Sequence, residues 1–183
     1  MARRIAYTGA PVLTLEQVAF QCHAEPEDLQ PELIDLIIIP GVTAQGESKT
    51  GAAIREAVYE EDWPAHYPSG HALDVGQVVA VESVLVLGEQ GSQAEYGGRA
   101  EVVQGGKESY LRFPDGRPEG PLRIRYRAGV DLQAHPGVLS WMLMAAETAF
   151  SHRGLLVVGQ TLTELPSSFV DHLLADITVP PRF

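Results

Sequence analysis

The amino-acid sequence predicts an α+β fold, in which a small helical bundle is formed by both ends of the chain and an antiparallel β insertion lies in the middle. Apolar residues recur at helical spacing near the two ends, and they alternate with polar residues at period two through the middle. Glycines and prolines separate the middle segments as turns do. We divide the chain into N-terminal helices at 1–51, a β-rich insertion at 52–130, C-terminal helices at 131–175 and an extended tail at 176–183.

The first helix is predicted to begin after Thr14, because Thr14 and Gln17 stand at the spacing of a capping box. An apolar stripe at i, i+3, i+4 and i+7 follows: Leu15, Val18, Ala19 and Cys22. Cys22 is the only cysteine, which excludes a disulfide within the chain. We interpret Cys22 as a small buried residue of this stripe.

A second helix is predicted to carry Pro31 in its first turn. Its buried side should consist of four aliphatic residues: Leu33, Ile34, Ile37 and Ile38. Pro40 and Gly41 should kink or stop this helix, because proline removes a backbone donor and clashes with the preceding turn. Whether the helix resumes over 42–49 stays open at this point.

Five segments of the middle region have the composition of strands. Residues 54–63 alternate at period two, and 78–87 are so rich in aliphatic side chains that both faces should be buried. Residues 100–103 and 109–113 flank a Gly-Gly pair and predict a hairpin. In the last segment Leu122, Ile124 and Tyr126 alternate with three arginines, which is typical of a half-buried strand.

The third long helix is the most clearly marked element, with Pro136 in its first turn and His152 at its end. Apolar residues cover most of its circumference, so the helix should lie at the centre of the core or pack against a neighbouring subunit. Trp141 is our candidate for that subunit contact. A capping box at Ser168 and Asp171 predicts one further short helix before the proline-containing tail.

Charge and hydropathy exclude several classes of function. The net charge is −11, and the first 62 residues hold 11 acidic and 4 basic side chains. Such a surface repels phosphate, which makes sequence-reading nucleic-acid binding improbable. The chain contains neither a run of about twenty apolar residues for a membrane span nor the apolar stretch of a signal peptide after Met1. We therefore expect a soluble intracellular protein without a membrane partner.

The sequence lacks the combinations of residues that a catalytic or metal site would need. The stretch 41–50 resembles a phosphate-binding loop, but Glu47 and Ser48 separate the second glycine from Lys49. His66 and His71 lie in a loop without further ligands, so we expect solvated side chains and no metal. The carboxylates at 60–62 should form a solvated edge. We expect no cofactor and no enzymatic activity.

Two surfaces are candidates for protein contacts. Arg123, Arg125 and Arg127 share one strand face and are either ordinary solvent-exposed residues or a basic seam that meets acidic residues of a neighbouring copy. The tail is either disordered or an extended segment that adds to a partner. It consists of Asp176, Ile177, Thr178, Val179, Pro180, Pro181, Arg182 and Phe183.

The order of these elements resembles the neck adaptor proteins of long-tailed phages, also called head–tail connector or head-completion proteins. Phe150 to Arg153 stands where an aromatic-x-x-Arg helix end is usual in that family. The other segments that carry the resemblance are residues 13–18, 50–54, 83–87 with Tyr96, 125–129 and 173–175.

The resemblance implies a structural virion protein, made in the cytoplasm of a bacterial host. Its copies would form a ring, dodecameric in the virion, that sits on the portal protein, helps to retain packaged DNA and receives a downstream neck or tail-completion protein. The tail, from about Asp171 to Phe183, would bind the portal, and DNA would only pass through the lumen. Two alternatives from other classes are a nucleotide- or metal-dependent hydrolase that uses Lys49 or the His66/His71 loop, and a generic peptide-binding β module.

Overall fold

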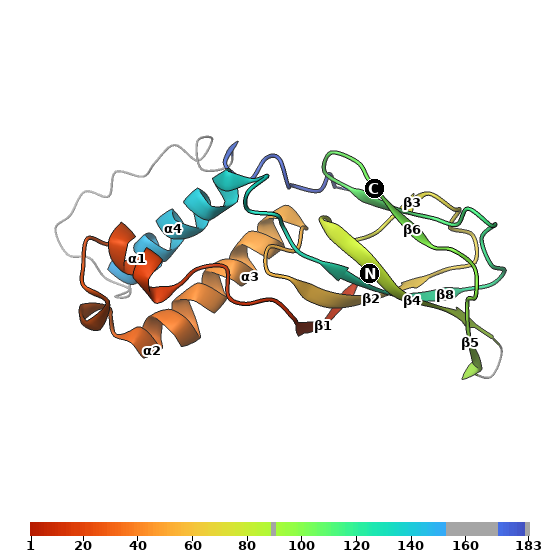
Figure 1. Ribbon diagram of the computed structural model, residues 1–183, viewed down its shortest axis with the longest axis horizontal. Coiled ribbons are helices and arrows are strands. Elements are labelled where there is room, and N and C mark those ends of the chain that lie inside the picture. The colour runs from red at the N-terminus through yellow and green to blue at the C-terminus, as the bar shows by residue number, and fades with distance from the viewer. Residues whose placement is uncertain (89–90, 153–171, 182–183) are drawn as a thin grey trace. The chain divides into compact units, whose positions relative to one another are not determined.

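The computed structural model describes residues 1–88, 91–152 and 172–181, and the chain forms two compact units (Figure 1). The helical unit comprises Pro11–Thr50 and Asp131–Asp176. The β unit comprises Met1–Ala10, Gly51–Val130 and Ile177–Phe183. The predicted α+β class is therefore confirmed, and all strands except β1, which lies near the N-terminus, come from the middle of the chain. None of the helices in the described parts of the chain is long and apolar enough to cross a membrane.

Helix α1 (Leu15–Gln21) begins as the sequence predicts. The Thr14 hydroxyl accepts a hydrogen bond from the Gln17 backbone at 3.3 Å, and the Gln17 side chain accepts one from the Thr14 backbone at 2.9 Å. Val18 and Ala19 are buried beneath the helix. Cys22 lies at the C-cap and is only half buried, and desolvation together with the negative charge of Glu147 raises the pKa of its thiol.

The second helix does not stop at Pro40. After a 3-10 turn at Pro26–Leu29, α2 (Pro31–Leu33), a π turn (Ile34–Ile38) and α3 (Ile39–Thr50) follow without a break. The backbone amide of Ile39 donates to the carbonyl of Ile34, five residues back. This wider turn precedes a proline that has no amide hydrogen and would otherwise crowd the preceding carbonyls. The extra residue also shifts the helical phase, so that Ile37 is exposed and our prediction that it is buried was wrong.

Helix α4 (Pro136–Ser151) begins at the predicted proline and supplies much of the core of the helical unit, but it ends just before His152, which forms the C-cap and not the last turn. Val138, Trp141, Met142 and Ala146 are buried along it. It lies beside α1, where the Gln21 amide donates to the Glu147 carboxylate at 2.7 Å. The short helix predicted after Ser168 lies largely outside the described residues.

Two antiparallel sheets enclose the core of the β unit. The five-stranded sheet has the order β1-β2-β8-β4-β5, and the three-stranded sheet has the order β3-β7-β6. The strands are β1 (Arg3–Tyr7), β2 (Ala57–Trp63), β3 (His71–Ala72), β4 (Val78–Leu87), β5 (Gln93–Glu95), β6 (Glu101–Gln104), β7 (Ser109–Arg112) and β8 (Leu122–Ala128). Strands β6 and β7 form the predicted hairpin.

The core of this unit contains aromatic and aliphatic side chains from both sheets, including Tyr59, Trp63, Leu111 and Tyr126. The rings of Tyr59 and Tyr126 stack with centroids 5.9 Å apart on neighbouring strands. Strand β4 departs from our prediction, because only one of its faces points into this core and Val79 is 55% exposed.

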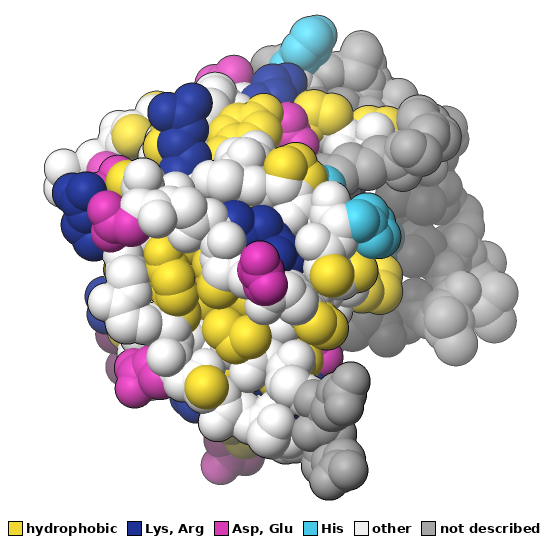
Figure 2. All heavy atoms as spheres, turned by 90° about the vertical axis from the view of Figure 1, so that its right-hand side faces the viewer, with side chains coloured by type: hydrophobic (Ala, Val, Ile, Leu, Met, Phe, Trp, Pro, Cys, Tyr) yellow, Lys and Arg dark blue, Asp and Glu magenta, His cyan; other side chains and the backbone are white. Residues whose placement is uncertain are grey.

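Figure 2 looks onto this part of the molecule and shows acidic and basic side chains interspersed with hydrophobic ones.

The β unit also receives both chain ends. Strand β1 pairs with β2, so our prediction that residues 1–51 belong to the helices was wrong for this segment. At the other end Ile177 is fully buried, and the side chain of Val179 lies against Gly51 and Gly76. The chain therefore passes between the two units more often than the predicted segmentation implies.

Candidate functional site on the five-stranded sheet

The candidate site is the solvent-facing side of the five-stranded sheet, where strands β2 and β8 carry most of its charged residues. Period-two alternation turns Leu122, Ile124 and Tyr126 into the core, and all three are fully buried. The intervening arginines face outward, as the sequence predicts. The antiparallel register places Arg123 opposite Asp62 and Arg125 opposite Glu60.

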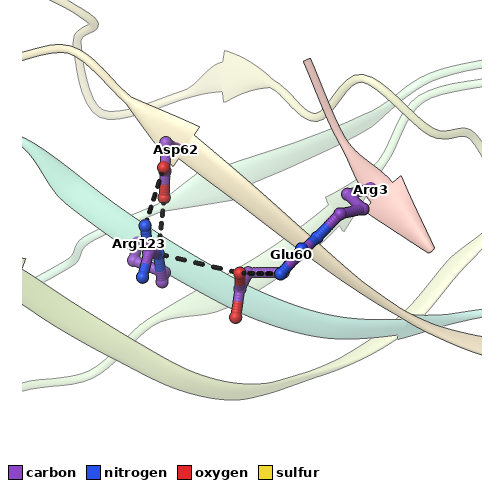
Figure 3. Close-up of polar contacts among 4 residues, drawn as sticks. All are labelled: Arg3, Glu60, Asp62 and Arg123. Carbon is purple, nitrogen blue, oxygen red and sulfur yellow. Dashed lines mark hydrogen bonds and ion pairs between the residues drawn. The ribbon is translucent and has the colours of Figure 1, made fainter. Parts of the chain in front are cut away.

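Every arginine of this row has an acidic partner in the same chain. The Arg123 guanidinium donates to both oxygens of Asp62, from Nε at 2.7 Å and from Nη2 at 2.9 Å. Its Nε also lies 3.8 Å from Oε1 of Glu60, which accepts a hydrogen bond from Arg3 at 3.0 Å (Figure 3). The charged face, as we name it, consists of Arg3, Glu56, Glu60, Asp62, Glu82, Arg123, Arg125 and Arg127.

The remaining pairs extend the charged face to both neighbouring strands. Arg125 Nε lies 3.2 Å from Glu82 Oε2 on β4, and Arg127 Nη1 lies 3.7 Å from Oε1 of Glu56, the residue just before β2. Hydrogen bonds from Arg123 lower the pKa of the Asp62 carboxyl, and the same contact raises the pKa of Arg123. Both groups therefore stay ionised at neutral pH.

The charged face is thus electrically balanced within one chain, with four arginines and four carboxylates. Half-exposed pairs of this kind contribute little stability each and remain able to exchange partners at a surface. The predicted pairing of these arginines with acidic residues of a neighbouring copy stays a prediction.

Glu61 lies between Glu60 and Asp62 in sequence but points to the opposite side of the sheet. It is 2% exposed and accepts hydrogen bonds from Trp63 Nε1 at 2.7 Å, Tyr126 Oη at 2.9 Å and the Asp74 amide at 3.0 Å. Our expectation of a solvated edge was wrong for this residue, because it shares the inward phase of Tyr59 and Trp63. Desolvation raises the pKa of its carboxyl, and it likewise raises the pKa of Tyr126.

The other sequence candidates lie apart from the charged face. Residues 41–50 belong to the continuous helix α3 and form no loop that could wrap a phosphate. His66 is exposed, whereas His71 is half buried in β3, its ring centroid 3.8 Å from that of Tyr67. The described ranges contain no group of three or more histidine, cysteine, aspartate or glutamate side chains that could hold a metal ion. A hollow of about 370 Å³ on the three-stranded sheet is lined by Gly70, Val103, Gln104, Gly105, Tyr110 and Arg112.

The predicted partner-binding residues have varied exposure. Trp141 is only 4% exposed inside the helical unit. In the tail, Ile177 is fully buried, Thr178 and Val179 are half buried, and Asp176, Pro180 and Pro181 are exposed. Arg182 and Phe183 lie outside the described residues. The apolar side chains at 177 and 179, which we assigned to a partner, are therefore in contact with their own β unit.

Sequence reasoning missed three members of the charged face, namely Arg3, Glu56 and Glu82. Arg3 belongs to β1, and the segment Arg3–Tyr7 is short enough that its alternation gives a weak signal. Glu82 was overlooked because the aliphatic run of β4 suggested burial on both faces. The phase of β2 was readable, since Tyr59 and Trp63 fix which side of that strand faces inward.

The whole fold has counterparts among solved structures. A chain in the neck of an empty gene transfer agent (GTA) particle, computed with C6 symmetry, matches with a TM-score of 0.75 and 14% identity, covering 100% of this chain and 97% of that one. A chain in the virion of the native GTA particle matches with a TM-score of 0.72, 14% identity and the same coverage. A chain in the neck of the native particle, computed with C12 symmetry, gives a TM-score of 0.65 and 12% identity, again with the same coverage.

No family model matches the sequence, and no curated protein matches it either. The likeness is therefore one of fold, and it extends over the full length of the chain. Neck components are the class of protein that the order of sequence elements resembles, so the fold expected from that resemblance is confirmed.

Proposed function

We propose that this chain is a structural protein of the neck of a phage-like particle, where it joins the head to the tail. The observation that carries the proposal is the full-length agreement in fold with chains of GTA necks and virions. The match includes both the helical unit and the β unit, so it does not depend on one common supersecondary motif.

In this role the copies assemble as a ring on the portal protein. The neck structures that share the fold were computed with sixfold and twelvefold symmetry. In a ring each copy uses one surface toward the preceding neighbour and a different surface toward the next one. The side of the ring away from the portal then receives a downstream neck or tail-completion protein.

We assign portal binding to the tail, in which some residues anchor the segment to the β unit and others contact the portal. Ile177 and Val179 anchor the segment to its own β unit, where Val179 contacts Gly51 and Gly76. Pro180 and Pro181 are exposed and cannot donate backbone hydrogen bonds, and each proline favours an extended conformation for the residue before it. The portal then contacts the chain from residue 180 onward, together with exposed Asp176.

The distribution of charge fits a ring that DNA passes through without binding. The helical unit contains 12 acidic residues and only two basic ones, Lys49 and Arg153, whereas the β unit contains 12 acidic and 11 basic residues. A surface with this acidic excess neutralises no phosphates and releases no counterions. We therefore assign the helical unit to the lumen, where it helps to retain packaged DNA without gripping it.

Mixing the protein with purified portal rings tests the assembly. We expect electron microscopy to show an additional ring of density on one end of the portal. A chain that ends after Val179 keeps both anchoring residues, so it should melt at the same temperature as the full chain and fail to attach. Attachment of this shortened chain would contradict the tail assignment, and absence of any ring with the full chain would contradict the neck function itself.

A further inference from the structure

The helical run from α2 to α3 carries an exposed face without charge. Leu36 and Ile37 are 74% and 62% exposed, unusually high for large aliphatic side chains. One turn further along, Pro40 and Gly41 are exposed, and Ala44 and Gln45 follow one turn later. These positions form two adjacent rows at a spacing of four residues. We call Leu36, Ile37, Pro40, Gly41, Ala44 and Gln45 the α3 face.

The α3 face interrupts an otherwise acidic surface. Between Asp35 and Glu47 the sequence contains no charged residue, although the helical unit as a whole has ten more acidic than basic side chains. By contrast, Phe20 is the exposed aromatic residue of α1, and it stands among polar neighbours such as Glu16 and Gln17. The α3 face is therefore distinguished by its length and by its lack of charge.

Its shape suits close contact with another protein surface. Leu36 and Ile37 project apolar side chains at one end, and the small residues Gly41 and Ala44 leave the backbone accessible beyond them. A methyl group added at Gly41 would meet no atom within 4 Å outside the adjoining turns of its own helix. An apolar end beside a shallow small-residue surface allows a second backbone to approach and to cover the aliphatic side chains.

We propose that the α3 face binds a second copy of this chain, an inference that rests on the ring assembly proposed above. Each copy in the ring carries a helical unit with a net charge of −10, derived from 12 acidic and two basic residues. Like charges repel most strongly where no solvent separates them, so an uncharged surface on this unit is the part that a different surface of the neighbouring copy can cover without placing carboxylates against one another. The α3 face provides such a surface and gains the burial of two exposed aliphatic side chains on contact.

A photo-crosslinker at position 36 identifies the protein that covers the α3 face. The variant Leu36→Cys is made together with Cys22→Ser and is labelled with a benzophenone maleimide. Val79→Cys in the same background is the matched control, because Val79 is an exposed aliphatic residue of the β unit. After assembly on portal rings and irradiation, we expect position 36 to give an adduct of two copies of this chain and position 79 to give none.

Other adducts overturn the inference. An adduct of position 36 with the portal, or rings visible by microscopy without any adduct of two copies, would contradict contact between copies while leaving the neck function intact. Absence of rings under all conditions would contradict the neck function and this inference together.

Charge substitution gives an independent readout. The double variant Leu36→Asp/Ile37→Asp should fold with an unchanged circular dichroism spectrum, because both side chains are solvent-exposed, and it should form at least tenfold fewer rings. Val79→Asp should form rings like the parent chain. Rings of the double variant at the parental yield would refute the proposal.

Discussion

At the residue scale, the carboxylates of β2 show how strand phase decides what an ionisable group does. Glu60 and Asp62 point outward and meet arginines in water, whereas Glu61 points inward and is surrounded by three hydrogen-bond donors. The three side chains are chemically almost the same, so their different behaviour follows from the alternation of the strand alone.

The contact between Asp62 and Arg123 should be measurable as a coupling energy. In a double-mutant cycle with Asp62→Asn and Arg123→Gln we expect a coupling of about 0.5–1 kcal/mol, the upper range for exposed pairs, because the contact is bidentate. Denaturant unfolding at low salt and at about 1 M salt provides the measurement, and screening should reduce the coupling. A coupling that is independent of salt would contradict an electrostatic origin.

The pH dependence of this pair has a defined sign. The folded-state pKa of Asp62 lies below its ordinary value of 3.8 because of the hydrogen bonds from Arg123. At pH values around the folded-state and ordinary pKa of Asp62, the unfolded state therefore binds more protons than the folded state. The stabilising contribution is present above pH 3.8 and is lost as the pH falls through the folded-state pKa.

Glu61 should show the opposite dependence. Burial raises its pKa above the ordinary value of 4.5, so ionisation of this residue destabilises the fold as the pH rises above that value. Glutamine cannot ionise, and the stability of Glu61→Gln relative to the parent chain should therefore improve steadily from about pH 4.5 toward neutrality. Thermal unfolding of both proteins across this range is the measurement. A difference that stays constant with pH would show that burial does not control this carboxyl.

At the scale of elements, the contact between the tail and Gly76 determines how the chain end is held. A Cβ atom at position 76 would lie 2.7 Å from Val179 Cγ2 and 3.1 Å from the Lys107 carbonyl oxygen. Gly76→Ala should therefore displace the tail and destabilise the β unit by about 1–3 kcal/mol, the usual range for overpacking.

A second substitution, at Val179, tests whether the clash with Val179 causes this effect. Val179→Ala removes the clashing methyl groups, so the double variant Gly76→Ala/Val179→Ala should regain protection of residues 177–179 in hydrogen exchange, which Gly76→Ala alone should lose. Gly116→Ala is a control for glycine replacement in an exposed turn, although its positive φ of 99° adds a local strain there. If Gly76→Ala leaves hydrogen exchange at residues 177–179 unchanged, then the packing of Val179 against Gly76 does not hold this segment in place.

The elements that sequence reasoning predicted well are those whose signal is local. The capping box at Thr14, the alternation of β8 and the proline start of α4 depend on neighbours a few residues away. The exposed phase of Ile37, by contrast, depends on where a π turn inserts an extra residue. Local pattern rules assume a constant helical period and therefore miss this shift.

The charged face was predicted only in part for a similar reason. The outward row of arginines follows from period two in one strand, but the identity of their partners depends on strand order. Pairing of β8 with both β2 and β4 brings Asp62 and Glu82 to this row from distant parts of the sequence. Long-range pairing of this kind is not encoded in any single segment, so the acidic partners within the chain could not be chosen in advance.

At the scale of the whole molecule, the division into two units separates two kinds of surface. Most of the net charge resides on the helical unit, whereas the β unit is almost neutral with its charges interspersed (Figure 2). The sequence alone places much of the acidic excess in the first 62 residues, but the structure divides that segment between both units. The relevant quantity is therefore the charge of a folded unit rather than of a stretch of chain.

This separation predicts how the protein behaves toward DNA. The parent chain should not retard duplex DNA in a gel even at about 0.05 M salt, where electrostatic attraction is least screened. The triple variant Glu25→Lys/Glu27→Lys/Asp28→Lys changes three exposed residues of the helical unit and raises the net charge by six. It should bind DNA with an affinity that falls steeply as salt increases, because each new phosphate contact releases counterions.

A neutralised variant separates loss of repulsion from gain of attraction. Glu25→Gln/Glu27→Gln/Asp28→Asn leaves the helical unit acidic and supplies no cation, so we expect it to remain without DNA binding. Retardation by the parent chain or by this neutral variant would mean that some other surface attracts phosphate. In that case the acidic excess would not explain how DNA passes the protein, and the assignment of the helical unit to the lumen would be wrong.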